Sequence, residues 1–336
     1  MRKQLLYIGN KLSIHGKTLT NIETLGPLLE QQGHAVCYAS SKKNRLFRLF
    51  DMIVQTFRFS KSDYVLIDTY STSNFWYAFL ISQLCRLLKI KYIPILHGGN
   101  LPLRLQKNPR LCQMIFNHAH RNVAPSNYLF EAFKNAGFTN LVNIPNAIQM
   151  ENYPFKKRTE ISPKLLWVRS LAPIYNPEMA IEVLQKLQND FPNAALCMVG
   201  PDKDNKLAGL QQMAQRLGIQ VTFTGKLPKP DWIQLSEQYD IFINTTHFDN
   251  MPVSVIEAMA LGLPVVSTNV GGLPFLLKDR KTAWLVNDND ATAMATGIKE
   301  IIQNRTFGQQ MITNAKHDIQ QFDWNEVGAK WNEVLI

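Results

Sequence analysis

The chain has 336 residues, enough for two domains that each bury a sizeable core. With 46% hydrophobic and 18% charged residues, its composition is that of an ordinary globular protein. The formal net charge of +10 favours anionic partners such as phosphates, nucleotides or acidic lipid headgroups. No nucleic-acid recognition module is visible, so nucleic acid is not expected among the partners.

Cysteine usage and the N-terminal sequence bear on the compartment. The four cysteines are scattered: Cys37, Cys85, Cys112 and Cys197. Since no C-x-x-C pair occurs, neither a zinc site nor a disulfide framework is indicated, and we expect a reduced, cytoplasmic protein. The opening MRKQLLYIGN has too few apolar residues for a signal peptide. The longest apolar stretch, 75–88, is too short to span a bilayer.

Short apolar runs alternate with helix-length segments along the chain. In the first half the predicted strands are LLYIG (5–9), AVCYA (35–39), YVLID (64–68), YIPIL (92–96) and NVA (122–124), with helices over 19–31, 75–88 and 126–135. In the second half they are KLLWV (164–168), ALCMVG (195–200), VTFTG (221–225), IFINT (241–245) and PVVST (264–268), with helices over 177–188, 206–217, 230–238 and 252–261. This alternation predicts parallel sheets wrapped by helices.

Two such series predict an α/β protein of two facing, doubly wound Rossmann-like domains. We expect an N-terminal domain over 1–150 and a C-terminal domain over 151–320. The segment 321–336 predicts an amphipathic helix that packs back toward the N-terminal domain, with one apolar face: Trp324, Val327, Trp331 and Val334. Ligands of such sheets bind at the carboxyl ends of the strands, so we expect the site in a cleft between the domains.

Two segments of the first half invite a functional interpretation. GNKLSIHGKT (9–18) resembles a phosphate-binding P-loop, but six residues separate Gly9 from Gly16, which argues against that reading. The segment 41–61, SKKNRLFRLFDMIVQTFRFSK, mixes Lys and Arg with Leu, Phe, Ile and Val. It is typical either of a basic amphipathic helix on an acidic membrane surface or of a core-packed helix with a solvated basic edge.

The stretch HFDNMPVSVIEAMALGLPVVS (247–267) carries the strongest chemical signal. Pro252 suits the first position of a helix that ends at Gly262. The free N–H groups of that helix start favour an anion. Asp249 precedes the helix and Glu257 lies inside it, and carboxylates are rarely buried without a partner. These acids either accept hydrogen bonds from ligand hydroxyls, or Asp249 caps the helix and Glu257 has a basic partner.

The same stretch is similar to the acid-x7-acid motif, E-G-x-P-x4-E-A-M-A-x-G-x-P-V-V, of GT-B-fold retaining glycosyltransferases of family 4. Other segments resemble that family in the same order along the chain: QQGHAV (31–36), VAPSNYL (123–129), NIPNAI (143–148), GGLP (271–274) and FDW (322–324). The acid-x7-acid stretch with its flanks is specific, whereas the other matches are individually weak.

The resemblance implies transfer of a sugar from a nucleotide-diphosphate donor to an acceptor hydroxyl, with retention and without a metal or cofactor. The C-terminal domain would bind the nucleotide sugar, and the N-terminal domain would bind a glycan or lipid-linked glycan acceptor. It implies a role in polysaccharide or cell-envelope biosynthesis. The cysteine usage favours the cytoplasm, and the membrane reading of 41–61 would place the protein peripherally at the inner membrane face. A nucleotide-sugar epimerase and a non-catalytic binding subunit on the same fold remain alternatives.

The resemblance also implies residue roles. Glu257 would bind the ribose hydroxyls and Asp249 the donor sugar. Sugar or phosphate would face the segment that starts the helix: Asn250, Met251, Pro252 and Val253. His97 matches a family histidine near the donor sugar and acceptor, although a histidine at a strand end is often structural. Glycines allow close approach of a ligand, and those expected near it are Gly16 (followed by Lys17), Gly98, Gly99, Gly200 and Gly225.

The chain departs from the family pattern at several positions. Asp249, Asn250 and Phe275 stand where the family usually has Glu, Gly and an acid. Ser170 and Tyr175 replace the Arg and Lys that grip the diphosphate in the family. Arg169, one position earlier, is either the substitute cation or an ordinary surface ion-pair former, and the reserve cations are Lys203 and Lys226.

Overall fold

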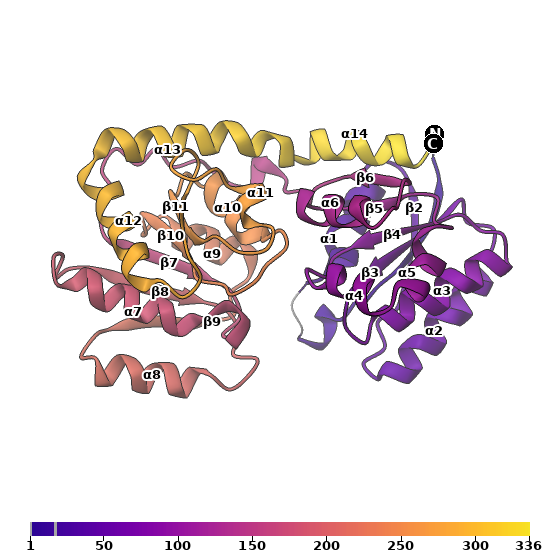
Figure 1. Ribbon diagram of the computed structural model, residues 1–336, viewed down its shortest axis with the longest axis horizontal. Coiled ribbons are helices and arrows are strands. Elements are labelled where there is room, and N and C mark those ends of the chain that lie inside the picture. The colour runs from indigo at the N-terminus through magenta and orange to yellow at the C-terminus, as the bar shows by residue number, and fades with distance from the viewer. Residues whose placement is uncertain (1, 17–18) are drawn as a thin grey trace. The chain divides into compact units, whose positions relative to one another are not determined.

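The computed structural model describes residues 2–16 and 19–336 and divides into two compact units (Figure 1). The first unit is Met1–Ala147 together with Trp324–Ile336, and the second is Ile148–Asp323. Each unit is built around one six-stranded sheet. Among the described residues, no helix combines the length and apolar character that a membrane crossing requires.

The sheet of the first unit is parallel, in the order β2-β1-β3-β4-β5-β6. Its strands are β1 (Gln4–Ile8), β2 (Ala35–Ala39), β3 (Tyr64–Thr69), β4 (Tyr92–Leu96), β5 (Asn122–Ala124) and β6 (Leu141–Asn143). Its helices are α1 (Asn21–Gln31), α2 (Arg45–Arg58), α3 (Phe75–Leu87), α4 (Leu101–Lys107), α5 (Pro109–Phe116), α6 (Asn127–Asn135) and α14 (Trp324–Val334). A 3₁₀ turn spans Ser13–His15.

Both faces of this sheet are buried, which explains why its strands read as continuous apolar runs. Along β1 the side chains alternate: Leu5 and Tyr7 join one core layer, and Leu6 and Ile8 join the other. The first layer also contains residues of α14: Trp324, Val327, Trp331 and Val334. The last helix therefore completes the core of the first unit, although it follows the second unit in sequence.

The sheet of the second unit is also parallel, in the order β12-β11-β10-β7-β8-β9. Its strands are β7 (Lys164–Val168), β8 (Ala195–Val199), β9 (Val221–Gly225), β10 (Ile241–Asn244), β11 (Val265–Thr268) and β12 (Trp284–Val286). Its helices are α7 (Pro177–Gln188), α8 (Leu207–Arg216), α9 (Lys229–Ser236), α10 (Val253–Ala260), α11 (Leu273–Leu276), α12 (Ala291–Gln303) and α13 (Arg305–Asp318). Three 3₁₀ turns span Met150–Asn152, Pro173–Tyr175 and Ile319–Phe322.

The predicted fold class, two Rossmann-like α/β domains, is confirmed. Each predicted strand is present, whereas β6 and β12 were not predicted. One detail is corrected: α10 begins at Val253, and Pro252 is its N-cap and not its first helical residue. The reason is that Pro252 combines a φ of −70° with an extended ψ of 111°, outside the helical region.

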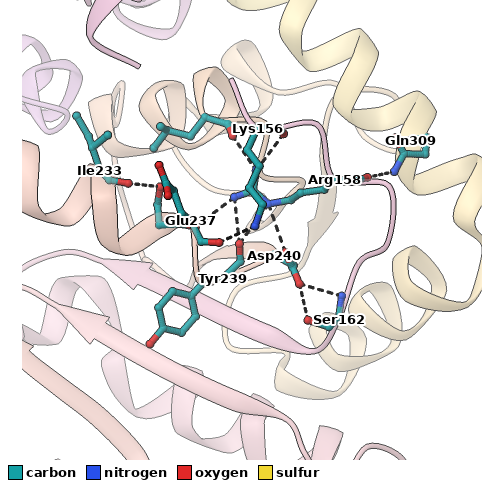
Figure 2. A network of polar contacts seen from close by, with 10 residues as sticks. Lys156, Arg158, Ser162, Ile233, Glu237, Tyr239, Asp240 and Gln309 are labelled. Atoms are coloured by element: carbon teal, nitrogen blue, oxygen red, sulfur yellow. Dashed lines mark hydrogen bonds and ion pairs between the residues drawn. The ribbon is translucent and has the colours of Figure 1, made fainter. Parts of the chain in front are cut away.

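A buried arginine connects the start of the second unit to its helices (Figure 2). The Arg158 guanidinium donates hydrogen bonds to the carbonyl oxygens of Leu261 (2.7 Å), Tyr239 (3.0 Å) and Ser236 (3.2 Å). It also pairs with Asp240 Oδ1 at 3.6 Å. Ser236 ends α9 and Leu261 is the C-cap of α10, so Arg158 supplies donors that the carbonyl groups at helix ends lack. It thereby fixes the end of α10, the helix that carries Glu257.

Candidate functional site

An ion pair lies at the carboxyl ends of two neighbouring strands of the second unit. Arg169 directly follows β7, and Asp249 lies in the loop between β10 and α10. Arg169 Nη2 is 2.5 Å from Asp249 Oδ2, and the two side chains are only 16% and 19% exposed. Because β7 ends at Val168, Arg169 is free of the strand's alternation and reaches the neighbouring strand end. It is therefore a half-buried partner of Asp249 and not a surface ion-pair former.

The Arg169 guanidinium keeps unused hydrogen-bonding capacity. Its central carbon lies 5.0 Å from the centre of the Tyr175 ring, and its Nε is buried with no hydrogen-bond partner among the described residues. Asp249 accepts a second hydrogen bond, 2.8 Å long, from the backbone N–H of Asn250. Buried polar atoms normally have hydrogen-bond partners. The unpaired Nε can therefore donate to a ligand acceptor such as a phosphate oxygen.

The start of α10 presents further donors. The N-cap residue, Pro252, makes no side-chain capping hydrogen bond, and Asp249 pairs with Arg169. Ser254, the second helical residue, has a buried hydroxyl without a partner in the described part of the chain. Asn250, Met251 and Pro252 are buried, and Val253 is half-buried. A helix start attracts anions through its backbone N–H groups.

Glu257 lies inside α10 and is almost completely buried. Its Oε1 accepts a 2.7 Å hydrogen bond from the Tyr153 hydroxyl and forms an ion pair with Lys229 Nζ. Burial raises the pKa of Tyr153, and the Glu257 carboxylate raises it further, so Tyr153 remains a donor. Lys229 is thus the basic partner that the second interpretation of the acids in 247–267 predicted for Glu257. Neither Lys229 nor Tyr153 was predicted, since both come from distant segments.

Two consecutive glycines hold the Asp249 loop. The N–H of Gly272 donates a 2.9 Å hydrogen bond to the carbonyl oxygen of Asp249. A Cβ on Gly271 would lie 2.2 Å from that same oxygen, and one on Gly272 would lie 1.8 Å from the carbonyl oxygen of Asn250. Only glycine permits this approach, which gives the G-G-x-P segment a physical reason.

Gly200 brings the ends of β7, β8 and β9 together beside Arg169. Its φ is +154°, and a Cβ there would lie 1.6 Å from the Arg169 carbonyl oxygen. Its N–H donates to the carbonyl oxygen of Gly225 at 2.9 Å. The reserve cations, Lys203 and Lys226, are exposed in the loops that follow these glycines.

A second polar cluster lies in the first unit around His97, which directly follows β4. His97 Nε2 is 2.8 Å from Asp68 Oδ1, and the Asp68 side chain is only 1% exposed. The Tyr7 hydroxyl donates to the same oxygen at 3.0 Å. A carboxylate can only accept, so Nε2 of the histidine carries the hydrogen and Nδ1 is left as an acceptor in the neutral ring.

The neighbours of this cluster fix its geometry. The His97 ring packs against Tyr70, with 5.3 Å between the ring centres, and burial raises the pKa of Tyr7. Asp68 was not predicted, although an acid at the end of the buried run YVLID was a readable signal. Its Oδ2 is buried without a partner among the described residues.

The other predicted residues of the first unit have simpler positions. A Cβ on Gly98 would lie 2.6 Å from the backbone nitrogen of Ser71, so Gly98 packs against the loop after β3, and Gly99 is half-buried beside it. Gly16 is exposed at the end of the Ser13–His15 turn, and Lys17 lies outside the described residues. Within residues 2–16 and 19–336, no three His, Cys, Asp or Glu side chains are grouped so as to hold a metal ion.

Solved structures share the fold of the whole chain. The structure of Anabaena Alr3699/HepE in complex with UDP and glucose matches with a TM-score of 0.79 at 19% identity and covers 99% of both chains. Sucrose-phosphate synthase from Thermosynechococcus elongatus matches with the same TM-score, 0.79, at 15% identity, over 99% of this chain and 98% of that one.

Curated relatives match over about half of this chain. Sulfoquinovosyl transferase SQD2 of Arabidopsis thaliana is 25% identical over 158 residues, which are 46% of this chain and 30% of the relative. D-inositol 3-phosphate glycosyltransferase of Streptomyces coelicolor is 27% identical over 181 residues, 50% of this chain and 39% of the relative. The chain therefore aligns with less than half the length of each. The model of the glycosyl transferases group 1 family matches residues 149–318, half of the chain, and the chain belongs to that family.

Proposed function

We propose that the chain is a retaining, metal-independent glycosyltransferase of family 4 that moves a sugar from a nucleotide-diphosphate donor to an acceptor hydroxyl. The observation that carries the proposal is the Arg169–Asp249 pair beside the start of α10, where Arg169 Nε and the Ser254 hydroxyl are buried without partners among the described residues, with the buried Glu257 on the same helix. A cation, the N–H groups of a helix start and carboxylates are what a diphosphate bearing two sugars requires.

The second unit would hold the donor. Arg169 and the first turn of α10 would stabilise the negative charge that grows on the leaving nucleoside diphosphate. Glu257 would accept hydrogen bonds from the ribose hydroxyls, with Tyr153 keeping the carboxylate in place. Asp249 would contact the donor sugar. The backbone beside Gly200 and Gly225 would approach the ligand closely.

The first unit would bind the acceptor, a glycan or lipid-linked glycan of cell-envelope or polysaccharide synthesis. His97, oriented by Asp68, would contact the acceptor or the transferred sugar. Support for the donor comes from similar proteins: the Anabaena neighbour was solved with UDP-glucose, and a Mycolicibacterium smegmatis relative is named as GDP-mannose-dependent. We place the enzyme in the cytoplasm, peripherally at the inner membrane face.

The first experiment is a thermal-shift panel of nucleoside diphosphates and nucleotide sugars that includes UDP, GDP and their glucose and mannose conjugates. We expect one nucleotide to stabilise the protein, and we expect Arg169→Ala and Glu257→Ala to lose that stabilisation. Arg216→Ala removes an exposed arginine at the end of α8 and serves as the matched control.

The responding nucleotide sugar then serves in a transfer assay. Retention predicts that NMR finds the same anomeric configuration in donor and product, and metal independence predicts full activity in EDTA. Nucleotide binding without transfer or donor hydrolysis would favour a non-catalytic subunit. Conversion of the donor to its epimer would favour an epimerase. Absence of stabilisation by every nucleotide would refute the donor site.

A further inference from the structure

The first unit exposes an apolar helix face that the sugar-transfer proposal does not use. On α2, five large apolar side chains are between 41% and 77% exposed: Leu46, Phe47, Phe50, Val54 and Phe57. At about 100° per residue, the five positions fall within an arc of roughly 100° on one side of the helix. They form one continuous apolar stripe, which we call the outer face of α2.

The opposite side of α2 meets the protein through both polar and apolar side chains, and Met52 and Ile53 join a core layer of the first unit. Its buried residues are Arg48, Met52 and Thr56. The Arg48 guanidinium donates to the carbonyl oxygens of Lys42 and Lys43, each at 2.8 Å, and to Asn10 at 3.0 Å. The helix therefore turns Arg48 and Thr56 inward and exposes its three phenylalanines. α2 therefore packs on the core, as the second reading of 41–61 expects, but its solvent-facing side carries a row of exposed apolar side chains and not a basic edge alone.

Exposed cations stand at both ends of the outer face. Lys42, Lys43 and Arg45 surround the start of α2, and Arg58 and Lys61 follow its last exposed phenylalanine. The acid on the helix, Asp51, is half-buried and accepts a hydrogen bond from Gln55. An apolar stripe between clusters of positive charge is the pattern of helices that lie in the interface of an anionic membrane.

The neighbouring helix also exposes large apolar side chains. α3 packs against α2 (Figure 1), and the Tyr77 hydroxyl donates to the carbonyl oxygen of Arg45 at 3.1 Å. α3 exposes Trp76, Leu80 and Leu87. Trp76 and Leu80 are four residues apart and so lie on the same side of α3. Tryptophan is enriched at membrane interfaces, where its ring lies at the level of the headgroups.

We propose that the outer face of α2 inserts into the acyl region of an anionic lipid bilayer while the flanking cations bind lipid phosphates. An anionic bilayer is favoured as the partner because its negative headgroups complement the cations at both ends of the outer face. A second copy docked symmetrically through the same face would bring like-charged clusters together, which opposes association. The proposal names the surface of the proposed enzyme that faces the membrane, and binding to lipid does not require donor or acceptor.

Co-sedimentation of the full chain with vesicles tests the proposal. We expect sedimentation with vesicles that contain phosphatidylglycerol, and at least a tenfold weaker association with phosphatidylcholine alone. The triple variant Phe47→Ser/Phe50→Ser/Phe57→Ser should lose binding to both. Its folding is checked by its melting temperature, which should match that of the parent because these side chains are exposed.

A charge-matched pair of variants isolates the electrostatic part. Lys42→Gln/Lys43→Gln/Arg45→Gln should weaken binding at least tenfold, whereas Arg216→Gln/Lys281→Gln/Arg305→Gln removes three exposed cations of the second unit and should bind like the parent. Ile336→Ser, at the exposed C-terminal residue, is the control for loss of an exposed apolar side chain.

Several outcomes would overturn the proposal. These are no sedimentation with anionic vesicles, equal sedimentation with both lipids, and unchanged binding by the phenylalanine triple variant. A dimer in light scattering that becomes monomeric in that variant would assign the face to a second copy. Nucleotide stabilisation is measured on the same proteins. Vesicle binding without any nucleotide response would refute the sugar-transfer proposal alone, and the reverse result would refute the membrane proposal alone.

Discussion

At the scale of single residues, the two acids of the acid-x7-acid stretch were readable from sequence, but their partners were not. Asp249 and Glu257 are eight positions apart in one segment. The predicted helix places Asp249 just before its start and Glu257 inside it, which marks both as candidate ligand-binding acids. Tyr153 and Lys229 reach Glu257 from segments that lie 104 and 28 positions away along the chain. Such contacts depend on how distant segments of the chain pack together, which a single sequence does not show.

The Lys229–Glu257 pair yields a prediction about stability. Lys229→Met leaves a buried carboxylate whose remaining partner is Tyr153, so we expect a loss of about 1–3 kcal/mol in the free energy of unfolding. Urea denaturation measures it. The double variant Lys229→Met/Glu257→Gln should recover most of the loss, because it removes the unpaired charge as well. A double variant as unstable as Lys229→Met would contradict this prediction, because removal of the unpaired charge would then recover nothing.

The His97–Asp68 pair yields a prediction about catalysis. Asp68→Asn keeps the shape of the side chain but replaces an acceptor-only group with one that also donates, so the histidine tautomer is no longer fixed. We expect kcat to fall about 10–100-fold, with nucleotide affinity and melting temperature little changed. Steady-state kinetics with the donor from the thermal-shift panel measures this effect. A fall in nucleotide affinity with kcat unchanged would contradict the proposed positioning role.

At the scale of elements, apolar runs predicted ten of the twelve strands of the two sheets. β6 and β12, which were not predicted, have three residues each, but β5 is equally short and was predicted, so length alone does not separate them. The start of α10 was misplaced by one residue because a proline fits both the N-cap and the first helical position by its φ. The inward orientation of Arg48 on α2 was not predictable, since its carbonyl partners become available only in the folded loop 42–43.

The Arg158 network yields a prediction at this scale. Arg158→Met keeps the apolar stem but leaves the carbonyl groups of Ser236, Tyr239 and Leu261 without these donors. We expect a loss of about 3 kcal/mol or more in the unfolding free energy of the second unit. Urea denaturation followed by tryptophan fluorescence measures it, with Arg216→Met as the exposed control. Equal stability of the two variants would mean that water replaces the guanidinium at these helix ends.

At the scale of the whole molecule, both sheets are parallel and buried on both faces, so the fold could be predicted from alternation alone. Burial of both faces also removes several tyrosine hydroxyls from water. Tyr7 and Tyr92 in the first unit and Tyr153 and Tyr239 in the second all have raised pKa values, mainly because of burial. Neither the burial nor the pKa of each tyrosine could be read from the sequence, because both depend on three-dimensional packing.

These tyrosines predict how stability depends on pH. A pKa that is raised in the folded state contributes stability that is fully present below the unfolded value, near 10, and is lost as pH rises above it. Each such tyrosine adds a slope of about 1.4 kcal/mol per pH unit above that point. We therefore expect steep alkaline unfolding, with the tyrosinate absorbance of the buried residues appearing together with loss of circular dichroism. Tyr153→Phe removes one such tyrosine, so the slope of stability against pH should fall by about 1.4 kcal/mol per pH unit. Tyrosinate absorbance from all tyrosines in a protein that still has its native circular dichroism would show that burial does not hold these hydroxyls protonated.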